Sequence, residues 1–325
     1  MSLTVRPYRD DESDLWDSFC QDALQATFLH TRRFISYHGD QFSDQSLVIE
    51  DQGKWVGLFP AALDPDDPSC VISHPGITYG GVLHQGKLRG ERMIQALSVI
   101  CRYYRSQGYI ELLYKAVPSF YHRVPAQDDL YAFFRLGATR YRCDLSCTID
   151  LNHSIDVSER RRRSLKKAIK AGLEIVEGME NLSALWVTLT ENLERKHGAK
   201  PVHKLQEISA LANKFPDQIR CVCAYASGEI VAGVLLFITY TSHHAQYIAS
   251  SLHGYKVSAL DLVFHHCIEK AMAEGKRWFD FGTSNESQGM VLNNGLYNFK
   301  SEFGGGGTVY EFYELNLEEE MRYVS

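Results

Sequence analysis

Residues 215–233 read FPDQIRCVCAYASGEIVAG, and residues 42–57 read FSDQSLVIEDQGKWVG. Both stretches begin with F-x-D-Q, continue into an apolar run, and pass through a turn that contains glycine. Each ends in a second run with a valine and a further glycine. Two apolar runs joined by a short glycine turn predict a β-hairpin. The same hairpin is therefore expected twice, about 175 residues apart.

A helix followed by a strand recurs at a similar offset. Residues 90–114 carry apolar side chains at helical spacing, then Gly108, then the strand-like run YIELLY. Residues 258–281 have the same order, with Gly275 before the run WFDF. Glycine directly after a periodic stretch is typical of a left-handed helix cap. The chain is therefore expected to contain one unit of hairpin, helix and strand, written twice.

Length and composition fit a two-domain globular chain. The protein has 325 residues, of which 45% are hydrophobic and 23% charged, and this excludes collagen-like, low-complexity and wholly disordered classes. The boundary is expected near residue 150, before a helix that begins at about Val157 with an Asp156–Glu159 capping box. No Pro/Gly/Ser-rich linker is visible there. Residues 1–150 and 151–325 are therefore expected to form two domains packed side by side, each α/β or α+β, with mixed sheets flanked by helices.

Charge and cysteine usage restrict the partners and the compartment. The net charge of -6 excludes a basic protein that coats nucleic acid, and no DNA partner is expected. The eight cysteines include no C-x-x-C pair, so reduced, buried thiols are expected and a metal site is not. The first residues lack the apolar segment of a signal peptide, and the longest apolar run is far shorter than the ~20 residues of a membrane helix. A cytoplasmic protein is expected.

One predicted helix is strongly basic. Its apolar stripe is expected at Leu165, Ala168, Ile169 and Gly172. Cations cover the remaining positions, namely Arg160, Arg161, Arg162, Arg163, Lys166, Lys167 and Lys170. A solvated helix face is one interpretation. The other is a site that holds a phosphorylated substrate or an RNA end, because guanidinium groups match phosphate and carboxylate oxygens.

The segment from 276 to 307 reads KRWFDFGTSNESQGMVLNNGLYNFKSEFGGGG. A strand ends at Gly282, where a loop rich in Ser, Asn and Gly begins, and loops past strand ends are where α/β proteins place their sites. Ser284 and Asn294 in this loop are candidates for substrate binding. Lys300 stands among the aromatic residues Phe299 and Phe303. It is expected either to stabilise a developing oxyanion or to extend over an aromatic surface.

Two further features of the sequence are candidate sites. Ser258 and Asp261 predict a capping box at the start of a helix, which either binds a pyrophosphate or is purely structural. The preceding LHGYKV is read as a loop. The adjacent pairs His243-His244 and His265-His266 point in different directions and have no metal spacing. No carboxylate–histidine base is evident, and no G-x-S-x-G, Walker A or G-x-G-x-x-G motif occurs.

These residues resemble a known family. The second half, from RRRRSLKKAIKAG through GEIVAGVLLF and AQYIASS to WFDFG and LYNFKSEFGG, is similar to the tandem GNAT-type acyltransferases. Within these, it is most similar to the FemAB-like group and its BioF2-like acetyltransferase relatives. The D-F-G followed by F-K-x-x-F-G is the most specific part. In the first half, FLHTRRFISY and HPGITYGG match more loosely, with His74-Pro75-Gly76 where Fem enzymes usually have an Arg-Gly-Pro turn.

The resemblance implies an arrangement of site residues. Phe299 and Lys300 match the family's aromatic–lysine pair beside the reacting acyl group. The acyl donor is expected along one strand and at a following helix start, at Tyr247, Ile248, Ala249, Ser258 and Ala259. The substrate is expected to contact two groups of side chains: the basic helix at Arg160, Arg161, Arg162 and Arg163, and the loop residues His74, Tyr79, Ser284 and Asn294.

The resemblance also implies a function. We expect an N-acyltransferase, with acyl-CoA (acetyl-CoA) as co-substrate and no metal, that acts on an amine of a cell-envelope sugar or its nucleotide-linked precursor. Direct attack in a ternary complex is expected. One alternative is a FemAB-like transferase that uses charged tRNA and a peptidoglycan precursor. Another is a non-catalytic binding module that keeps the tandem fold. The acceptor, the acyl group and the oligomeric state stay open.

Overall fold

The computed structural model describes residues 3–198 and 201–318, which form two compact units. The first unit comprises the described residues of Met1–Asp144, Asn285–Val291 and Val309–Ser325. The second comprises those of Leu145–Ser284 and Leu292–Thr308. The sequence placed all of 151–325 in the second domain. The structure divides the chain differently, because residues 285–291 and 309–318 belong to the first unit.

The first unit contains two groups of strands. One is the sheet of order β1-β2-β3, with bounds Thr4–Pro7, Leu47–Asp51 and Lys54–Phe59. The other has the order β4-β5-β6-β15-β7, with bounds Ala62–Leu63, Cys70–Ile72, Glu111–Lys115, Gly306–Asn316 and Thr139–Asp150. β2 and β3 pair antiparallel, so the hairpin predicted at 42–57 is confirmed. β5 and β6 pair in parallel, with the predicted helix between them in sequence.

Helices cover both faces of the strands in the first unit. They are α1 (Ser13–Asp22), α2 (Arg32–Ile35), α3 (Glu91–Ser106) and α4 (Asp128–Leu136). Leu47 and Ile49 of β2 lie in one apolar cluster with α3 and α4. Val48, the residue between them, lies in another cluster with Trp16 and Phe19 of α1. Because alternate residues of a strand point to opposite faces, β2 packs between α3 and α1.

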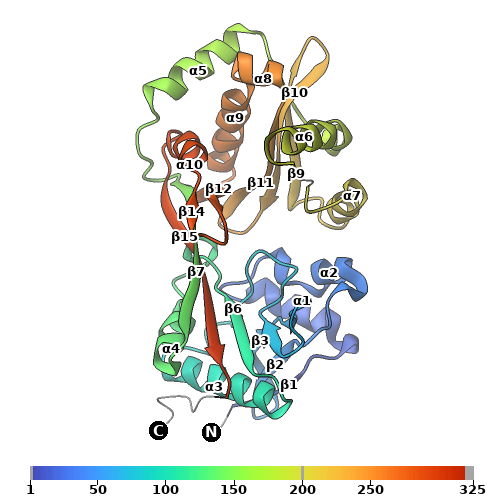
Figure 1. Ribbon diagram of the computed structural model, residues 1–325, viewed down its shortest axis with the longest axis vertical. Helices are drawn as coiled ribbons and strands as arrows, with labels where there is room; N and C mark the ends of the chain where they lie inside the picture. The colour runs from blue at the N-terminus through green and yellow to red at the C-terminus, as the bar shows by residue number, and fades with distance from the viewer. Residues whose placement is uncertain (1–2, 199–200, 319–325) are drawn as a thin grey trace. The chain divides into compact units, whose positions relative to one another are not determined.

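The second unit is built on a mixed sheet of order β7-β12-β11-β10-β9-β8 (Figure 1). The strands not yet given are β8 (Glu174–Glu177), β9 (Ile219–Ala226), β10 (Glu229–Ile238), β11 (Ser242–Ser250) and β12 (Trp278–Thr283). β9 and β10 form the antiparallel hairpin predicted at 215–233. β11 and β12 pair in parallel, with a helix between them in sequence. The order of hairpin, helix and strand is therefore present in both units.

Helices also cover both faces of this second sheet. They are α5 (Glu159–Lys170), α6 (Leu182–His197), α7 (Leu205–Lys214), α8 (Leu252–Val257), α9 (Ala259–Ala273) and α10 (Asn294–Ser301). Val234 and Leu236 of β10 pack in one apolar cluster with Val263 and Phe264 of α9. A side chain at Gly233 would instead meet Leu185 of α6 and Cys223. The expected mixed sheet with flanking helices is confirmed in this unit.

Cysteine chemistry follows the prediction. All eight cysteines are free thiols. Seven are buried, and Cys143 is half-buried. Cys221 and Cys223 lie on one face of β9 with their sulfurs 3.6 Å apart, which is not a bonded distance.

Four local expectations are wrong. The helix α5 is capped by Ser158, whose hydroxyl accepts from the backbone N–H of Arg161, so Asp156 is not its cap. The stretch LHGYKV is the short helix α8, because Ser251 caps it by accepting from the N–H of Gly254. Ser258 has a left-handed backbone (φ 61°) and makes no side-chain cap to α9. Ile169 is 59% exposed, so it does not belong to the buried stripe of α5.

The remaining strands of the described residues are β13 (Asn285–Glu286) and β14 (Val291–Leu292), which pair with each other. Among residues 3–198 and 201–318, none of the helices combines the length and the apolar composition that crossing a bilayer requires.

Gly254 allows α8 to lie directly against β10, and this predicts a sharp stability effect. A Cβ at this position would overlap the carbonyl oxygen of Val231, which is backbone and cannot move cheaply. Gly254→Ala is therefore expected to lower the free energy of unfolding by about 1–3 kcal/mol.

The matched control is Gly295→Ala in α10, where the nearest atom to the new Cβ is Asn293 Oδ1 at 3.7 Å. This control is expected to be neutral or to stabilise by about 0.4–1 kcal/mol. Equal free energies of unfolding for the two variants, measured by urea denaturation, would contradict the close contact.

Candidate active site

The parallel strands β11 and β12 pair over only three positions. The partners are Ser242 with Trp278, His243 with Phe279, and His244 with Asp280. Beyond His244, β11 continues to Ser250 in register with β10, whereas Thr283 of β12 is in register with Ser146 of β7. One edge of β11 is thus unpaired with β12 after His244. An unpaired strand edge offers backbone N–H and C=O groups to a ligand.

A bulge lies on β11 just past this point. Leu235 of β10 is opposite Tyr247, and Leu236 is opposite Ala245, so Gln246 is the extra residue. Bulges increase local twist and re-aim the groups next to them. The edge of β11 therefore changes direction where its pairing with β12 ends.

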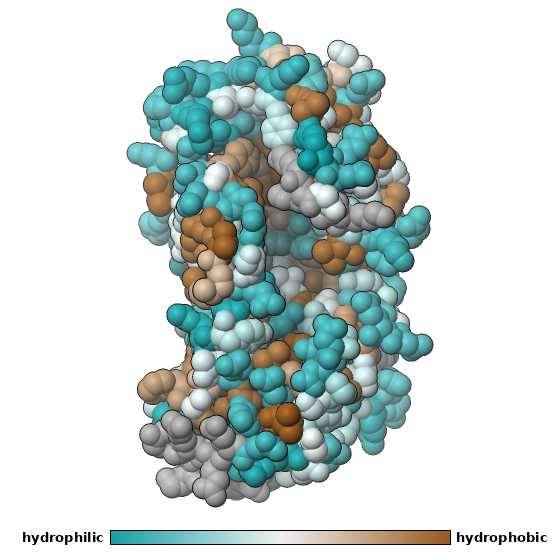
Figure 2. All heavy atoms as spheres, viewed as in Figure 1, coloured by the Kyte–Doolittle hydropathy of each residue, from teal (hydrophilic) through white to brown (hydrophobic). Residues whose placement is uncertain are grey.

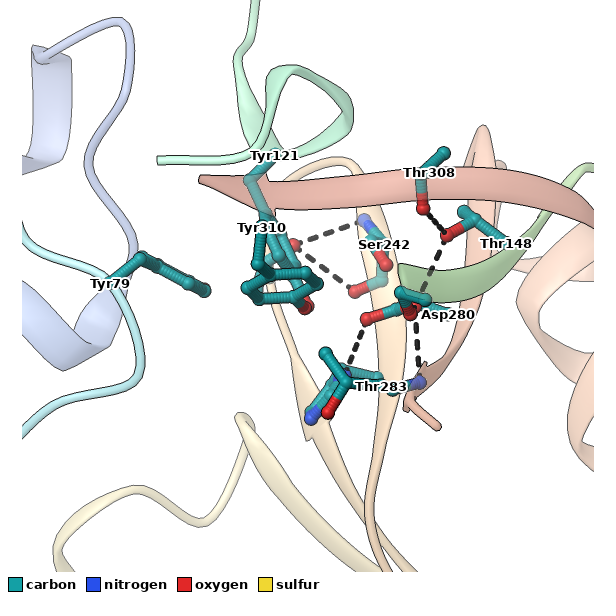
Figure 3. Close-up of polar contacts among 12 residues, drawn as sticks. Tyr79, Tyr121, Thr148, Ser242, Asp280, Thr283, Thr308 and Tyr310 are labelled. Atoms are coloured by element: carbon teal, nitrogen blue, oxygen red, sulfur yellow. Dashed lines mark hydrogen bonds and ion pairs between the residues drawn. The ribbon is translucent and has the colours of Figure 1, made fainter. Parts of the chain in front are cut away.

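The carboxylate of Asp280 is the polar centre of this region (Figure 3). Its side chain is fully buried. Oδ1 accepts from the Ser146 hydroxyl at 2.6 Å, the Thr148 hydroxyl at 3.1 Å and the Gly282 N–H at 3.1 Å. Oδ2 lies 2.7 Å from Nδ1 of His244. A buried carboxylate needs such partners, and here they come from three neighbouring strands.

Lys300 holds the end of β12 in place. It lies on α10 and is 3% exposed, and its Nζ donates to the carbonyl oxygens of Gly282 at 2.9 Å and Thr283 at 2.7 Å. Burial lowers the pKa of Lys300 from 10.5 to about 8, against the attraction of Asp280. A Cβ on Gly282 would lie 3.3 Å from Cε1 of His244. Lys300, Gly282 and His244 therefore meet where β11 and β12 part.

Phe299, the other predicted catalytic residue, lies in an aromatic cluster and is half-buried. Its ring centroid is 5.3 Å from Phe303 and 6.1 Å from Phe264. The guanidinium of Arg161 lies 4.9 Å from the Phe299 ring, a cation–π contact. Phe299 thus packs α10 against α9, through Phe264, and against α5, through Arg161.

Three of the four predicted arginines are engaged by carboxylates. Arg161 contacts Asp261 at 2.8 Å and Glu302 at 3.1 Å, and its side chain is 11% exposed. Arg160 contacts Glu302 at 2.7 Å, and Arg162 contacts Glu159 at 2.5 Å. Arg163 donates to the Glu159 carbonyl at 3.3 Å. Arg161 is therefore a link between helices, and the other three are exposed on α5.

A separate set of exposed cations lies on one face of α5. In residues 3–198 and 201–318, none of this set forms an ion pair with a carboxylate. The set is Arg163, Lys166, Lys167 and Lys170. Spacing of three and four residues places them on the same side of the helix. Hydrophilic side chains predominate over the α5 end of the second unit in Figure 2.

The predicted loop residues differ in exposure. Ser284 is 2% exposed, and its hydroxyl has no hydrogen-bond partner among the described residues. Its backbone N–H donates to Leu145, and its carbonyl accepts from Asn293, each at 2.9 Å. Asn294 is exposed in the first turn of α10. Ser284 thus lies directly after the carbonyl that Lys300 holds.

The predicted donor residues lie on both sides of the β11 sheet. The Tyr247 hydroxyl is hydrogen-bonded to His203, and its ring packs on Trp186 at 4.9 Å. Burial raises the pKa of Tyr247 to about 12. Ile248 packs on the α9 side, Ala249 is buried, and Ser258 and Ala259 form the junction of α8 and α9.

A cavity of about 650 Å³ lies at the C-terminal end of β11. Its lining includes Ser250, Ser251 and His253 from the end of β11 and the start of α8. Asn192 and Arg195 of α6 also line it. In the described part of the chain, no group of His, Cys, Asp and Glu side chains has the arrangement of a metal site.

His74 and Tyr79 belong to the first unit. His74 is buried, with φ 59°, and its carbonyl accepts from Lys115 at 3.2 Å. Burial lowers the pKa of His74 well below its usual value. Tyr79 is 2% exposed and stacks on Tyr121 at 4.7 Å. The hydroxyl oxygens of Tyr121 and Tyr310 are 3.1 Å apart and share a hydrogen bond. Both side chains are drawn in Figure 3.

The pair of His244 and Asp280 was missed from the sequence. Both residues were visible, one in His243-His244 and the other in the D-F-G motif. Their contact depends on the register of two parallel strands, which no local pattern contains. The statement that no carboxylate–histidine base is evident is therefore corrected by the structure.

Comparisons with known proteins agree with this geometry. Residues 157–301 match the family model described as an acetyltransferase (GNAT) domain. This match covers most of the second unit, whose fold is that of a GNAT-type domain. The predicted resemblance to GNAT acyltransferases is confirmed, and the match supports an enzyme that transfers acyl groups. A comparison with curated protein sequences finds no match.

Solved structures extend the likeness to the whole chain. FemX is 11% identical with a TM-score of 0.67, over 96% of this chain and 97% of that one. A tandem GNAT protein from the clavulanic acid biosynthesis pathway is 14% identical with a TM-score of 0.52, over 98% and 100%. The C-terminal domain of a protein described as a lysylphosphatidylglycerol synthetase from Agrobacterium fabrum is 13% identical with a TM-score of 0.58, over 80% and 81%. These likenesses show the tandem GNAT, FemAB-like fold.

The link between Arg161 and Asp261 predicts a pH dependence of stability. Burial raises the pKa of Asp261 from 3.8 to about 6, although Arg161 opposes this. The folded state therefore binds this proton more tightly than the unfolded state does. The contribution of Asp261 to the free energy of unfolding is fully present below pH 4 and is lost as pH rises to about 6.

Wild type is expected to lose about 1–2 kcal/mol more than Asp261→Asn between pH 4 and pH 6.5, allowing for partial solvent screening. Asp156→Asn, at an exposed position of the same unit, serves as the control and should follow wild type. Denaturant unfolding at both pH values measures the difference. If the free energies of unfolding of wild type and Asp261→Asn had the same pH dependence, the raised pKa of Asp261 would be contradicted.

Proposed function

We propose that this protein is an N-acyltransferase that moves an acyl group from an activated donor directly onto an amine. The observation that carries this is the parting of β11 from β12, with His244, Gly282 and Lys300 gathered at that point. The open edge of β11 binds the extended arm of the donor. Alignment of the donor and the amine there supplies about 7–11 kcal/mol of the barrier.

The donor we propose is an acyl-CoA, with acetyl-CoA as the first candidate. The GNAT family match supports this choice. The edge of β11 from Ala245 to Ser250 matches the amide groups of a pantetheine arm in chemistry. At the end of that strand, the cavity lined by Arg195, Asn192 and His253 offers hydrogen-bond donors for phosphates, beside the carboxylates of Glu191 and Glu229.

Within this proposal, Lys300 positions the reacting centre. Its Nζ donates hydrogen bonds to the carbonyl oxygens of Gly282 and Thr283 and so fixes the end of β12. The ammonium group also places positive charge next to the proposed site. Positive charge near a developing oxyanion lowers the barrier. Phe299 holds the helix that carries Lys300.

The acceptor we propose is an amine of a cell-envelope amino sugar or of its nucleotide-linked precursor. The likeness to FemX, and to a domain of a protein named for lysylphosphatidylglycerol synthesis, supports an envelope substrate.

The test is transfer from acetyl-CoA to a panel of amino sugars and nucleotide-linked amino sugars, followed by mass spectrometry. Wild type should form an N-acetyl product. Lys300→Met should reduce turnover at least ~10²-fold, because two carbonyls lose their donor. The absence of product with every acyl-CoA tested would overturn the CoA proposal and favour a binding module.

Lys276 provides a matched control for Lys300. It also donates to two backbone carbonyls, those of Thr239 at 2.7 Å and Tyr240 at 3.4 Å, but near the other end of β12. Lys276→Met should keep turnover within a few-fold of wild type. Equal losses in both variants, with circular dichroism showing both folded, would mean that Lys300 contributes only to stability.

A second candidate donor is an aminoacyl-tRNA, and the cation face of α5 favours it. Arg163, Lys166, Lys167 and Lys170 repel one another on one helix face, so they do not stabilise the helix. Four phosphate contacts would give binding a steep salt dependence.

Charged tRNA should bind wild type with an affinity that falls steeply with salt. Neutralising these four residues to Gln should reduce the log–log slope by about 2–4. The control neutralises four exposed cations of the first unit, Lys54, Lys87, Arg89 and Arg105, for an equal change in charge. Equal slopes for the two quadruple variants would exclude α5 as the tRNA contact.

A further inference from the structure

We infer that His244 is the general base of the transfer and that Asp280 fixes its tautomer. This inference rests on the proposed function and adds to it a catalytic pair. Such a pair is needed because an amine attacks a carbonyl only as a neutral group and must then lose a proton. A base is therefore required at the point where donor and amine meet.

The position of His244 satisfies that requirement. It is the last residue of β11 that is paired with β12, so it lies where the edge of β11 opens. Its side chain is 12% exposed, whereas Asp280 behind it is fully buried. A base must be within reach of the proton that it removes. The two residues have these different environments.

The groups around Asp280 donate hydrogen bonds to its carboxylate, which accepts them. Oδ1 takes hydrogen bonds from Ser146, Thr148 and the N–H of Gly282. The hydroxyl of Thr308 lies 2.6 Å from that of Thr148, so Thr308 can donate to Thr148 while Thr148 donates to Asp280. Three donors on one oxygen stabilise the ionised carboxylate.

An ionised Asp280 decides which nitrogen of His244 is the base. A carboxylate only accepts, so Nδ1 must carry the hydrogen that it directs to Oδ2 at 2.7 Å. In the neutral ring, Nε2 then bears the lone pair. Nε2 is thus the atom that takes the proton, and Asp280 stabilises the imidazolium that forms.

The groups around the ring are compatible with this role. Asp280 faces it from β12, and Gly282 lies against Cε1, with its carbonyl held by Lys300 of α10. Cys147 of β7 interacts electrostatically with both Asp280 and Lys300. Burial raises the pKa of Cys147 to about 12, so it stays a neutral thiol. The charged groups in these contacts are the carboxylate of Asp280 and the ammonium of Lys300.

The chemical step then balances. The neutral amine attacks the acyl carbon, the C–N bond forms, and the carbonyl electron pair moves to oxygen. The proton on nitrogen passes to Nε2 of His244. When the tetrahedral intermediate collapses, the C–S bond of the thioester breaks, and the leaving thiolate takes the proton from the imidazolium. With an aminoacyl ester as donor, the C–O bond breaks and the leaving hydroxyl takes that proton.

The neighbouring residue His243 provides an internal control. It also pairs with a carboxylate, since its Nε2 lies 2.9 Å from Oε2 of Glu274. It points to the other face of β11 and is fully buried. Burial lowers its pKa to about 4. One strand therefore carries two histidine–carboxylate pairs, of which one opens to the site.

The kinetic test compares these two pairs in the full-length protein, with acetyl-CoA and the amino sugar that wild type acetylates. His244→Gln should reduce kcat by ~10²–10⁴-fold, with KM for acetyl-CoA changed by less than threefold. The acid limb of the pH profile of kcat should disappear. His243→Gln and Glu274→Gln should keep kcat within fivefold and keep that limb.

A spectroscopic test does not depend on the acceptor. Long-range ¹H–¹⁵N spectra of histidine-labelled protein, assigned by the loss of signals in His244→Gln, should show His244 protonated at Nδ1 and bare at Nε2 at neutral pH. Asp280→Asn should change this tautomer. A hydrogen on Nε2, or a doubly protonated ring up to pH 9, would overturn the inference.

The outcomes separate the inference from the proposed function. If wild type acetylates no amine and uses no acyl donor, the proposed function is overturned, and so is the inference that His244 is its general base. If wild type is active and His244→Gln is equally active, only the inference is overturned. Loss of activity in His244→Gln and His243→Gln alike, with both folded, would also overturn it, because the effect would then be structural.

Discussion

A fully buried carboxylate, that of Asp280, is the constraint on which the rest of the site depends. An unsatisfied charge in such a position would cost several kcal/mol. Three donors on Oδ1 and His244 on Oδ2 satisfy it, and they come from β7, β12 and β11. The same contacts that make burial of the anion tolerable therefore fix the register of three strands and the orientation of one imidazole.

Two further buried charges extend this principle around the parting of β11 and β12. The ammonium of Lys300 is satisfied by two carbonyls at the end of β12, and the guanidinium of Arg161 by Asp261 and Glu302. Arg161 also lies over Phe299 on the helix that carries Lys300. Polar networks of this kind define one geometry when every member is satisfied. The geometry they define here keeps one edge of β11 unpaired with β12 beyond His244.

Local sequence patterns predicted much of this fold but few of the side-chain contacts in the site. The hairpins β2–β3 and β9–β10 were predictable because alternation and a glycine turn are local signals. Lys300 was found through its motif. The His244–Asp280 and Arg161–Asp261 contacts join residues 36 and 100 positions apart, so they required the folded sheet. The sequence does not predict α8, because six residues with one glycine are too few to show a helical period. The return of the chain to the first unit likewise depends on the pairing of β15 with β6.

The central claim is that the acyl donor lies along the edge of β11 that is unpaired with β12. Backbone chemical-shift mapping of the full-length protein, titrated with acetyl-CoA, tests this most directly. The account predicts saturable shifts of the amides from Ala245 to Ser250 and from Phe281 to Thr283, with smaller changes in the first unit. Saturable binding that leaves these amides unshifted, or no binding of acetyl-CoA at all, would contradict it.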